Sequence, residues 1–242
     1  MAHGAPDNFD VRPQSVSFPV ADMAELAARL GSIVVFDRRG DVIYLDDMTY
    51  GLRHWGILVA GVGSGVSVGT TYVHMGSQSL ALKAAGVSGA TAAIYKPFAY
   101  PHLSKIGAEI AFALDSLQDA FRLSLEVYTG TQRYWYEMKY DVTNTRLQCR
   151  TGATSWQTVD SDLKLMTDPR LFHYMKLVVD IENGAYVRGL VDSTEYDLSD
   201  VSVYSLSSSQ YAQVKVTITS DGDGVNESTC YVDCFILTQD EP

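Results

Sequence analysis

An apolar repeat with a period of two over residues 172–191 constrains the fold of this chain most strongly. Side chains on a β-strand point alternately to its two faces, so this pattern predicts strands with one buried face. Asn183-Gly184 lies between the two halves of the segment, and this dipeptide is a strong signal for a tight hairpin turn. If these two residues form the loop, we expect Leu177 to face Leu190 across the hairpin.

Much of the remaining chain shows similar short apolar runs, separated by turn residues and without helical periods between them. Residues 56–71 predict a strand, a glycine-rich turn and a second strand. Such regular spacing is typical of antiparallel sheets. We therefore expect an all-β fold, an antiparallel sandwich. The other expected strands are Ser79–Lys83, Thr91–Pro97, Ile106–Leu114, Phe121–Tyr128, Arg133–Val142, Arg146–Arg150, Trp156–Val159, and a closing hairpin of Val214–Thr219 with Thr229–Thr238.

The first part of the chain has a different composition. Three of the seven prolines fall within residues 1–19, which favours an extended N-terminal arm. A short helix is expected after Asp22, and a β-hairpin over residues 33–45. We therefore divide the chain into residues 1–44, used for docking or oligomerisation, and a sandwich domain over residues 45–242. The apolar side chains expected to dock on a partner are Phe9, Val16, Phe18, Val20, Met23, Leu26 and Leu30.

Charge and hydropathy exclude two classes of partner. Lys and Arg total 18 against 29 Asp and Glu, a net charge of −11, and no basic run is present. Binding to a nucleic-acid backbone is therefore not expected. No run of 18 apolar residues occurs, so a membrane partner is not expected either. The three cysteines, Cys149, Cys230 and Cys234, have no spacing typical of a zinc site or a disulfide framework.

Three stretches resemble the concanavalin-like and carbohydrate-binding-module jelly rolls. They are Leu45-Asp46-Asp47-Met48-Thr49-Tyr50-Gly51-Leu52-Arg53-His54-Trp55, the block over residues 172–198, and Tyr231-Val232-Asp233-Cys234-Phe235-Ile236-Leu237. The resemblance spans roughly residues 45–238 and implies two antiparallel sheets with the first and last strands side by side. The arm, helix and hairpin over residues 17–47 resemble those of phage-encoded virion structural proteins that carry a jelly-roll module.

The same resemblance suggests a structural calcium ion, the one cofactor considered. Asp46, Asp47 and Asp233 would converge on it if the terminal strands are neighbours, because calcium prefers several oxygen ligands. However, Met48-Thr49 and Cys234 replace acidic or aromatic residues of the pattern, which puts the ion in doubt. The alternative is that these carboxylates cap turns at strand ends.

No catalytic residue is predicted. The E-x-D-x-x-E strand typical of concanavalin-like hydrolases is absent, and Glu109, Glu126 and Glu137 fall on different expected strands. Tyr134, Trp135 and Tyr136 are a candidate glycan platform, although one face of their strand must belong to the core.

The main expectation is therefore a non-enzymatic virion structural protein of the capsid decoration or attachment type. It would be located in the virion, assemble through its N-terminal arm with other shell subunits, and form a homo-oligomer. The alternative is a carbohydrate-binding module that recognises glycan through exposed aromatic side chains.

Overall fold

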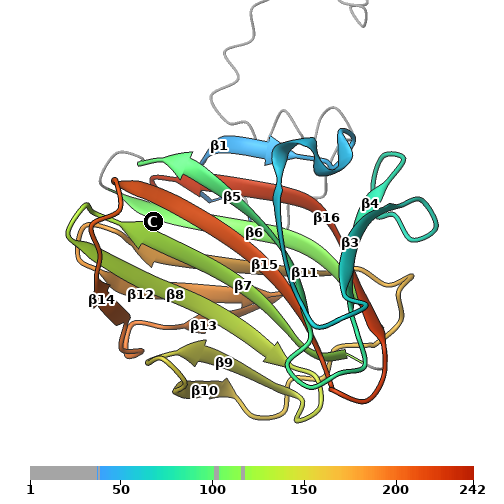
Figure 1. Ribbon diagram of the computed structural model, residues 1–242. Coiled ribbons are helices and arrows are strands. Elements are labelled where there is room, and N and C mark those ends of the chain that lie inside the picture. Colours follow the sequence, from blue (N-terminus) through green and yellow to red (C-terminus); the bar gives the residue numbers. More distant parts are fainter. Residues whose placement is uncertain (1–36, 38, 101–103, 116–117) are drawn as a thin grey trace, which may run out of the picture.

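Two antiparallel β-sheets pack face to face in the computed structural model (Figure 1). The structure describes residues 37, 39–100, 104–115 and 118–242. The expected all-β sandwich is confirmed, as is the jelly-roll class. In the described ranges the one helical element is the short 3-10 helix η2, Gly51–His54, and no helix is long and apolar enough to span a bilayer.

The first sheet, sheet A, has the strand order β13-β12-β11-β6-β16-β4-β3, with β1 added alongside β16. Its strands are β1 Asp41–Asp46, β3 Gly65–Gly69, β4 Ser79–Ala84, β6 Lys105–Leu114, β11 His173–Asp180, β12 Ala185–Val191, β13 Thr194–Asp197 and β16 Ser228–Gln239.

The second sheet, sheet B, has the order β10-β9-β8-β7-β15-β5-β2, with β14 paired to β8. Its strands are β2 Gly56–Ala60, β5 Thr91–Ala99, β7 Gln118–Tyr128, β8 Gln132–Asp141, β9 Arg146–Arg150, β10 Trp156–Asp160, β14 Tyr204–Ser207 and β15 Gln213–Gly222.

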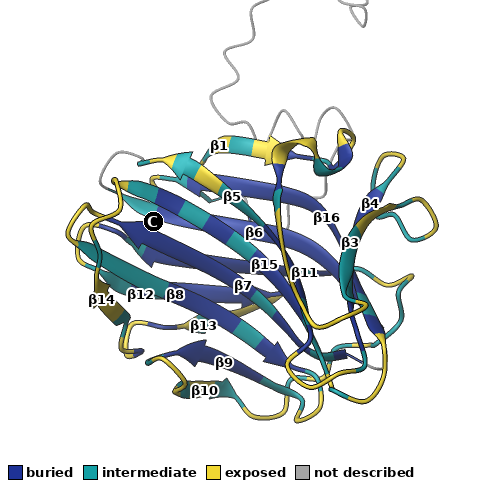
Figure 2. Ribbon diagram, in the orientation of Figure 1, coloured by how far each residue is buried: buried dark blue, intermediate teal, exposed yellow. Residues whose placement is uncertain are grey.

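The core lies between the sheets and is built by the inward-facing side chains of their central strands. These strands are mainly buried (Figure 2). Phe112 on β6 and Phe121 on β7 stack with ring centroids 4.1 Å apart and join the two layers. Both rings are fully buried, and burial of a side chain of this size stabilises the fold by about 1.5–3 kcal/mol.

The hairpin of residues 172–191 forms as β11 and β12, but its register differs from the expected one. Leu177 pairs with Gly189 rather than with Leu190, and the turn takes up residues 181–184 instead of two residues. The longer turn moves the pairing by two residues, and a bulge opposite Val178 and Val179, which leaves Val187 out of the register with β11, reduces the difference to one at Leu177.

The first and last strands of the sandwich pair as the resemblance implies, whereas the expected closing hairpin does not form. β1 pairs antiparallel with β16, so the first and last described strands are neighbours. The expected closing hairpin is wrong, because β15 belongs to sheet B and β16 to sheet A. The chain therefore crosses from one layer to the other between β15 and β16, and both strands contribute side chains to the shared core from opposite sides. The expected arm, its helix and the seven apolar side chains expected to dock on a partner lie outside the described residues.

A buried ion cluster fixes the C-terminus to the outer face of sheet A. Lys176 on β11 is fully buried, and its ammonium lies 2.7 Å from a Glu241 carboxylate oxygen and 2.9 Å from an oxygen of Asp37. Glu109 on β6 lies 4.0 Å from the same ammonium, and burial raises its pKa to about 8.

Tyr186 ties the two sheets together through the core. It lies on β12 of sheet A, yet its hydroxyl accepts a 2.9 Å hydrogen bond from the Glu137 backbone N–H and lies 3.0 Å from the Arg150 backbone carbonyl, to which it donates. Both partners belong to sheet B, so this hydroxyl satisfies backbone groups that water does not reach.

Replacing Tyr186 with Phe should lower the free energy of unfolding by about 1–3 kcal/mol, because two buried backbone groups lose their partner. Urea denaturation measures the change. Tyr211→Phe is the matched control, since Tyr211 is 92% exposed and should leave stability unchanged. Equal stability of both variants and the parent would contradict the role given to this hydroxyl.

Candidate functional site

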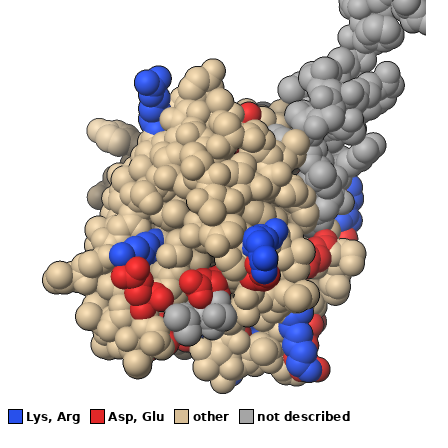
Figure 3. All heavy atoms as spheres, turned by 90° about the vertical axis from the view of Figure 1, so that its right-hand side faces the viewer, with Lys and Arg blue, Asp and Glu red and all other residues tan. Residues whose placement is uncertain are grey.

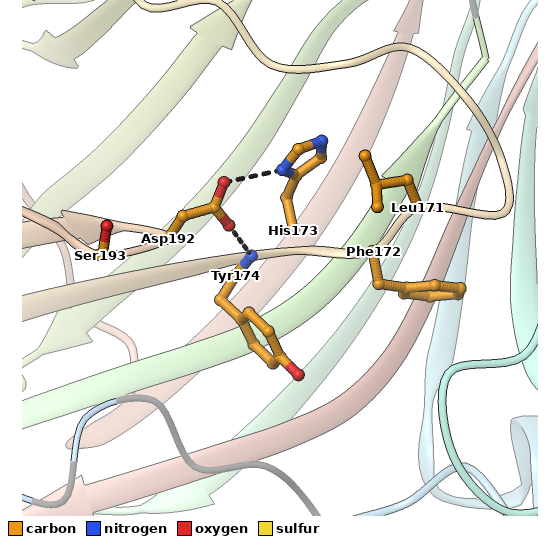
Figure 4. A pocket seen from close by; sticks show the side chains of 6 residues that line it. All are labelled: Leu171, Phe172, His173, Tyr174, Asp192 and Ser193. Atoms are coloured by element: carbon orange, nitrogen blue, oxygen red, sulfur yellow. Dashed lines mark hydrogen bonds and ion pairs between the residues drawn. The ribbon is translucent and has the colours of Figure 1, made fainter.

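Several hollows in the described surface bring polar side chains together, among them one beside β11 and one on sheet B. The larger, about 490 Å³, lies at one end of the sandwich and is lined by Leu171, Phe172, His173, Tyr174, Asp192 and Ser193 (Figure 4). The second, about 300 Å³, lies on the outer face of sheet B.

The first hollow contains a histidine that is already fully engaged. The Nδ1 atom of His173 lies 2.8 Å from an Asp192 oxygen, and its Nε2 atom lies 3.1 Å from the Met166 carbonyl (Figure 4 draws the first contact). Burial disfavours the imidazolium, but Asp192 and the carbonyl outweigh it, so the pKa of His173 is raised. With both ring nitrogens facing acceptors, His173 fixes the loop before β11 and is not free to act as a base.

The His173–Asp192 pair should make stability depend on pH. A histidine pKa raised by folding stabilises the fold fully below the unfolded value of about 6.5, and this stabilisation is lost as pH rises through the folded pKa. The free energy of unfolding in urea should therefore fall between pH 6 and pH 8 in the parent, and it should fall less in His173→Asn. Asp192→Asn should flatten the profile in the same way. An unchanged profile in both variants would contradict the pairing.

The second hollow, called here the sheet B hollow, is the stronger candidate for a binding site. Alternate side chains of β5, β7, β8 and β15 point outward into it, while their neighbours face the core. Its lining is Leu58, Thr91, Ala93, Arg122, Ser124, Glu126, Arg133, Trp135, Glu137, Lys215, Thr217 and Thr219.

Two almost fully buried carboxylates lie on the floor of the hollow. Glu137 is 1% exposed; it accepts a hydrogen bond from the Arg150 Nε atom and a 3.3 Å bond from the Arg122 guanidinium. The other is Glu126, 3% exposed, whose oxygens contact the Lys215 ammonium at 2.7 Å and the Arg133 guanidinium. Each carboxylate therefore has two cationic partners, which offset the cost of burying its charge.

The Tyr128 hydroxyl completes the Glu126 contacts with a 2.6 Å hydrogen bond. Burial, and then the Glu126 carboxylate, raise the pKa of Tyr128, so this hydroxyl stays protonated and donates. Burial opposes the charge on Arg122, but Asp221 and Glu137 outweigh it and raise the pKa of the guanidinium.

Cations and indole rings alternate across β8, β9 and β10. The guanidinium carbons of Arg133 and Arg150 lie 4.2 and 4.1 Å from the centre of the Trp135 ring. Arg150 also lies 4.6 Å from the Trp156 ring, and the Lys139 ammonium lies 4.3 Å from that ring. Such contacts hold the cations in fixed positions. The structure therefore presents an ordered set of positive groups beside the hollow.

The predicted glycan platform is divided between the core and the surface. Tyr136 is fully buried and Tyr134 packs against the core, so both lie on the inner face of β8. Trp135 alone faces outward and lines the sheet B hollow.

The candidate calcium ligands cap turns. Asp46 accepts a 2.9 Å hydrogen bond from a backbone N–H and a 3.1 Å bond from the Trp55 indole, and Asp47 accepts one from the backbone two residues later. Asp233 accepts hydrogen bonds from two successive backbone N–H groups of the loop before β4. Across the described ranges no group of three or more His, Cys, Asp or Glu side chains is arranged to hold a metal ion.

The arginines and the lysine of the hollow were not predicted from the sequence. Glu126 and Glu137 do lie on different strands, as expected, but the two strands are neighbours and bring both carboxylates to one surface. The available signal was a polar residue at every second position of strands whose other positions are apolar, as in Arg122-Leu123-Ser124-Leu125-Glu126.

The comparisons with known proteins give structural likeness without sequence likeness. No family model matches the chain, and no curated protein matches its sequence. An endo-β-1,4-glucuronan lyase from the fungus Trichoderma reesei is similar in fold, with a TM-score of 0.52 and 11% identity over 82% of this chain and 95% of the lyase. A carbohydrate esterase from the Shiga toxin-encoding bacteriophage phi24B gives 0.52 and 11% over 84% of this chain and all of the esterase.

A structure named sialidase also gives a TM-score of 0.52, with 10% identity over 86% of this chain. The matched region is 19% of that longer protein, so this chain corresponds to about a fifth of it. At such identities the likeness shows a shared fold.

These neighbours overturn the prediction that the protein is not an enzyme. Two proteins matched over nearly their whole length bear the names of enzymes, a lyase and an esterase, and the structure named sialidase contains this fold over about a fifth of its length. The absence of one hydrolase motif excluded only one arrangement of carboxylates, whereas the outer face of a sheet can carry many. Enzyme activity is therefore not excluded by the fold.

Proposed function

We propose that the protein binds carbohydrate in the sheet B hollow and that the preferred carbohydrate is acidic. The observation that carries this proposal is the fixed set of cations around the hollow. Arg122, Arg133 and Lys215 line it, and Arg150 and Lys139 stand next to it against the indole rings. Five cations stand here against three carboxylates, those of Glu126, Glu137 and Asp221, so this region carries an excess of two positive charges in a chain with a net charge of −11.

The geometry favours anion recognition over stacking of sugar rings on tryptophan. Trp135 and Trp156 already contact cations of their own chain, so those cations are ordered before a ligand arrives. Ordered guanidinium groups bind carboxylate or sulfate oxygens with charge-assisted hydrogen bonds, which are stronger than neutral ones. The hydroxyls of Ser124, Thr217 and Thr219 in the same lining suit the hydroxyls of a sugar.

The carbohydrate class is further supported by the names of the fold neighbours, a glucuronan lyase and a carbohydrate esterase. The role of the N-terminal arm in virion assembly stays a prediction, because residues 1–36 lie outside the described ranges.

Lys215→Gln should weaken binding of an acidic oligosaccharide about ten- to a hundredfold, because a charge-assisted hydrogen bond contributes about 1.5–3 kcal/mol. Calorimetric titration with oligouronates and with neutral oligosaccharides of the same length measures it. Lys164→Gln is the matched control, since it removes the same charge from a side chain that is 70% exposed and outside the hollow.

Binding of the acidic ligand should also fall as salt rises, because ions screen these charges. Equal affinity for neutral and acidic oligosaccharides, or equal loss in both variants, would contradict the proposal. Following the same samples for product formation separates binding from turnover.

A further inference from the structure

Two edge strands, each paired on one side only in the described ranges, lie along one side of the sandwich. β2 ends sheet B and β3 ends sheet A, and in the described ranges no strand pairs with the outer edge of either. An edge strand leaves backbone N–H and C=O groups unpaired, and natural proteins usually protect such edges with charged side chains or proline.

β2 has neither protection. Its sequence is Gly-Ile-Leu-Val-Ala, and the chain carries no Asp, Glu, Lys or Arg between Arg53 and Lys83. Acidic residues are absent from a longer stretch, residues 48–108, although the chain contains 29 of them. Figure 3 shows the side on which β3 and β4 lie, and the centre of that face is uncharged, with most of the visible charges along its lower part and its rim.

The exposed side chains there include residues that should belong to the core. Ile57 and Val59 pair with Ile94 and Ala92 of β5, whose side chains are fully buried between the sheets, so they face the same interior. Yet Ile57 is 44% exposed and Val59 is 51% exposed. Among the residues that the structure describes, the interior of the sandwich is therefore open along this edge.

We propose that a second copy of this chain covers the edge by pairing its own β2 antiparallel with this one. About a two-fold axis through the middle of β2, Leu58 opposes its own copy, and Ile57 opposes Val59 of the second molecule. Each of these pairs is apolar, so the edge is complementary to itself. Two chains of charge −11 repel each other, and an edge built from a stretch without acidic residues is where they meet with least repulsion.

Pairing in this way joins the two copies of sheet B into one continuous sheet. Leu58 lines the sheet B hollow, so the second molecule's Leu58 would extend the wall of that hollow. Any effect of this extension on carbohydrate binding rests on the proposed function. The proposed dimer itself is independent of that function.

Sedimentation of the full chain without carbohydrate tests the dimer. We expect twice the chain mass of 26.6 kDa for the parent, and the chain mass for Val59→Lys over the same dilution series. The lysine places one positive charge on each copy at the contact but lowers the overall repulsion, so loss of the dimer reports the local contact. Unchanged circular dichroism establishes that the variant is folded.

A cysteine at the centre of the pair locates the contact. Leu58→Cys should form a disulfide with its own copy on mild oxidation, because directly opposed residues of antiparallel strands lie within disulfide range. The three native cysteines are buried and do not compete. Gln157→Cys is the matched control, on the exposed strand β10 at the opposite edge of sheet B. On a denaturing gel without reducing agent it should migrate as a single chain, because its cysteines do not meet.

A parent that is monomeric at all concentrations would overturn the proposal. A dimer that survives Val59→Lys, a trimer or larger ring, or cross-linking of Gln157→Cys as readily as Leu58→Cys would overturn it too. Because no carbohydrate is present, these outcomes are independent of the proposed binding function.

Discussion

The structure depends on one constraint, the alternation of side chains along strands that belong to two packed sheets. Each central strand of sheet B has to supply apolar groups to the core at every second position. The remaining positions are free of that demand, and on β7 and β8 they carry Arg122, Glu126, Trp135 and Glu137. The core and the candidate site are thus two faces of the same strands, and the packing of one fixes the spacing of the other.

This constraint also explains why charges can be buried in the sheet B hollow. A carboxylate removed from water needs partners in fixed positions, and adjacent strands place side chains at regular separations. Glu137 on β8 thereby receives Arg122 from β7 and Arg150 from β9. The hydroxyl of Tyr186, coming from sheet A, fixes the backbone below the same residue. The rigidity of the site therefore derives from contacts in both layers.

The sequence predicted the fold class because the repeat with period two is local information. It did not predict pairing between distant strands. The closing strands, β15 and β16, were expected to pair, yet they lie in different sheets, and the turn at Asn183-Gly184 is longer than the dipeptide suggests. A single residue added by the bulge near Val178 changes which side chains face each other, and no pattern within one strand reveals such a shift.

The candidate site was harder to predict for the same reason. Glu126 and Glu137 are eleven positions apart in the sequence, and this spacing does not indicate a common surface until β7 and β8 are known to be neighbours. The edge of the sandwich shows the opposite case. The lack of charged residues in this strand is visible in the sequence. Its structural consequence depends on where the strand lies, because an uncharged strand in the middle of a sheet is ordinary. Only its position at the end of sheet B makes the exposure of Ile57 and Val59 relevant to the proposed pairing of two copies.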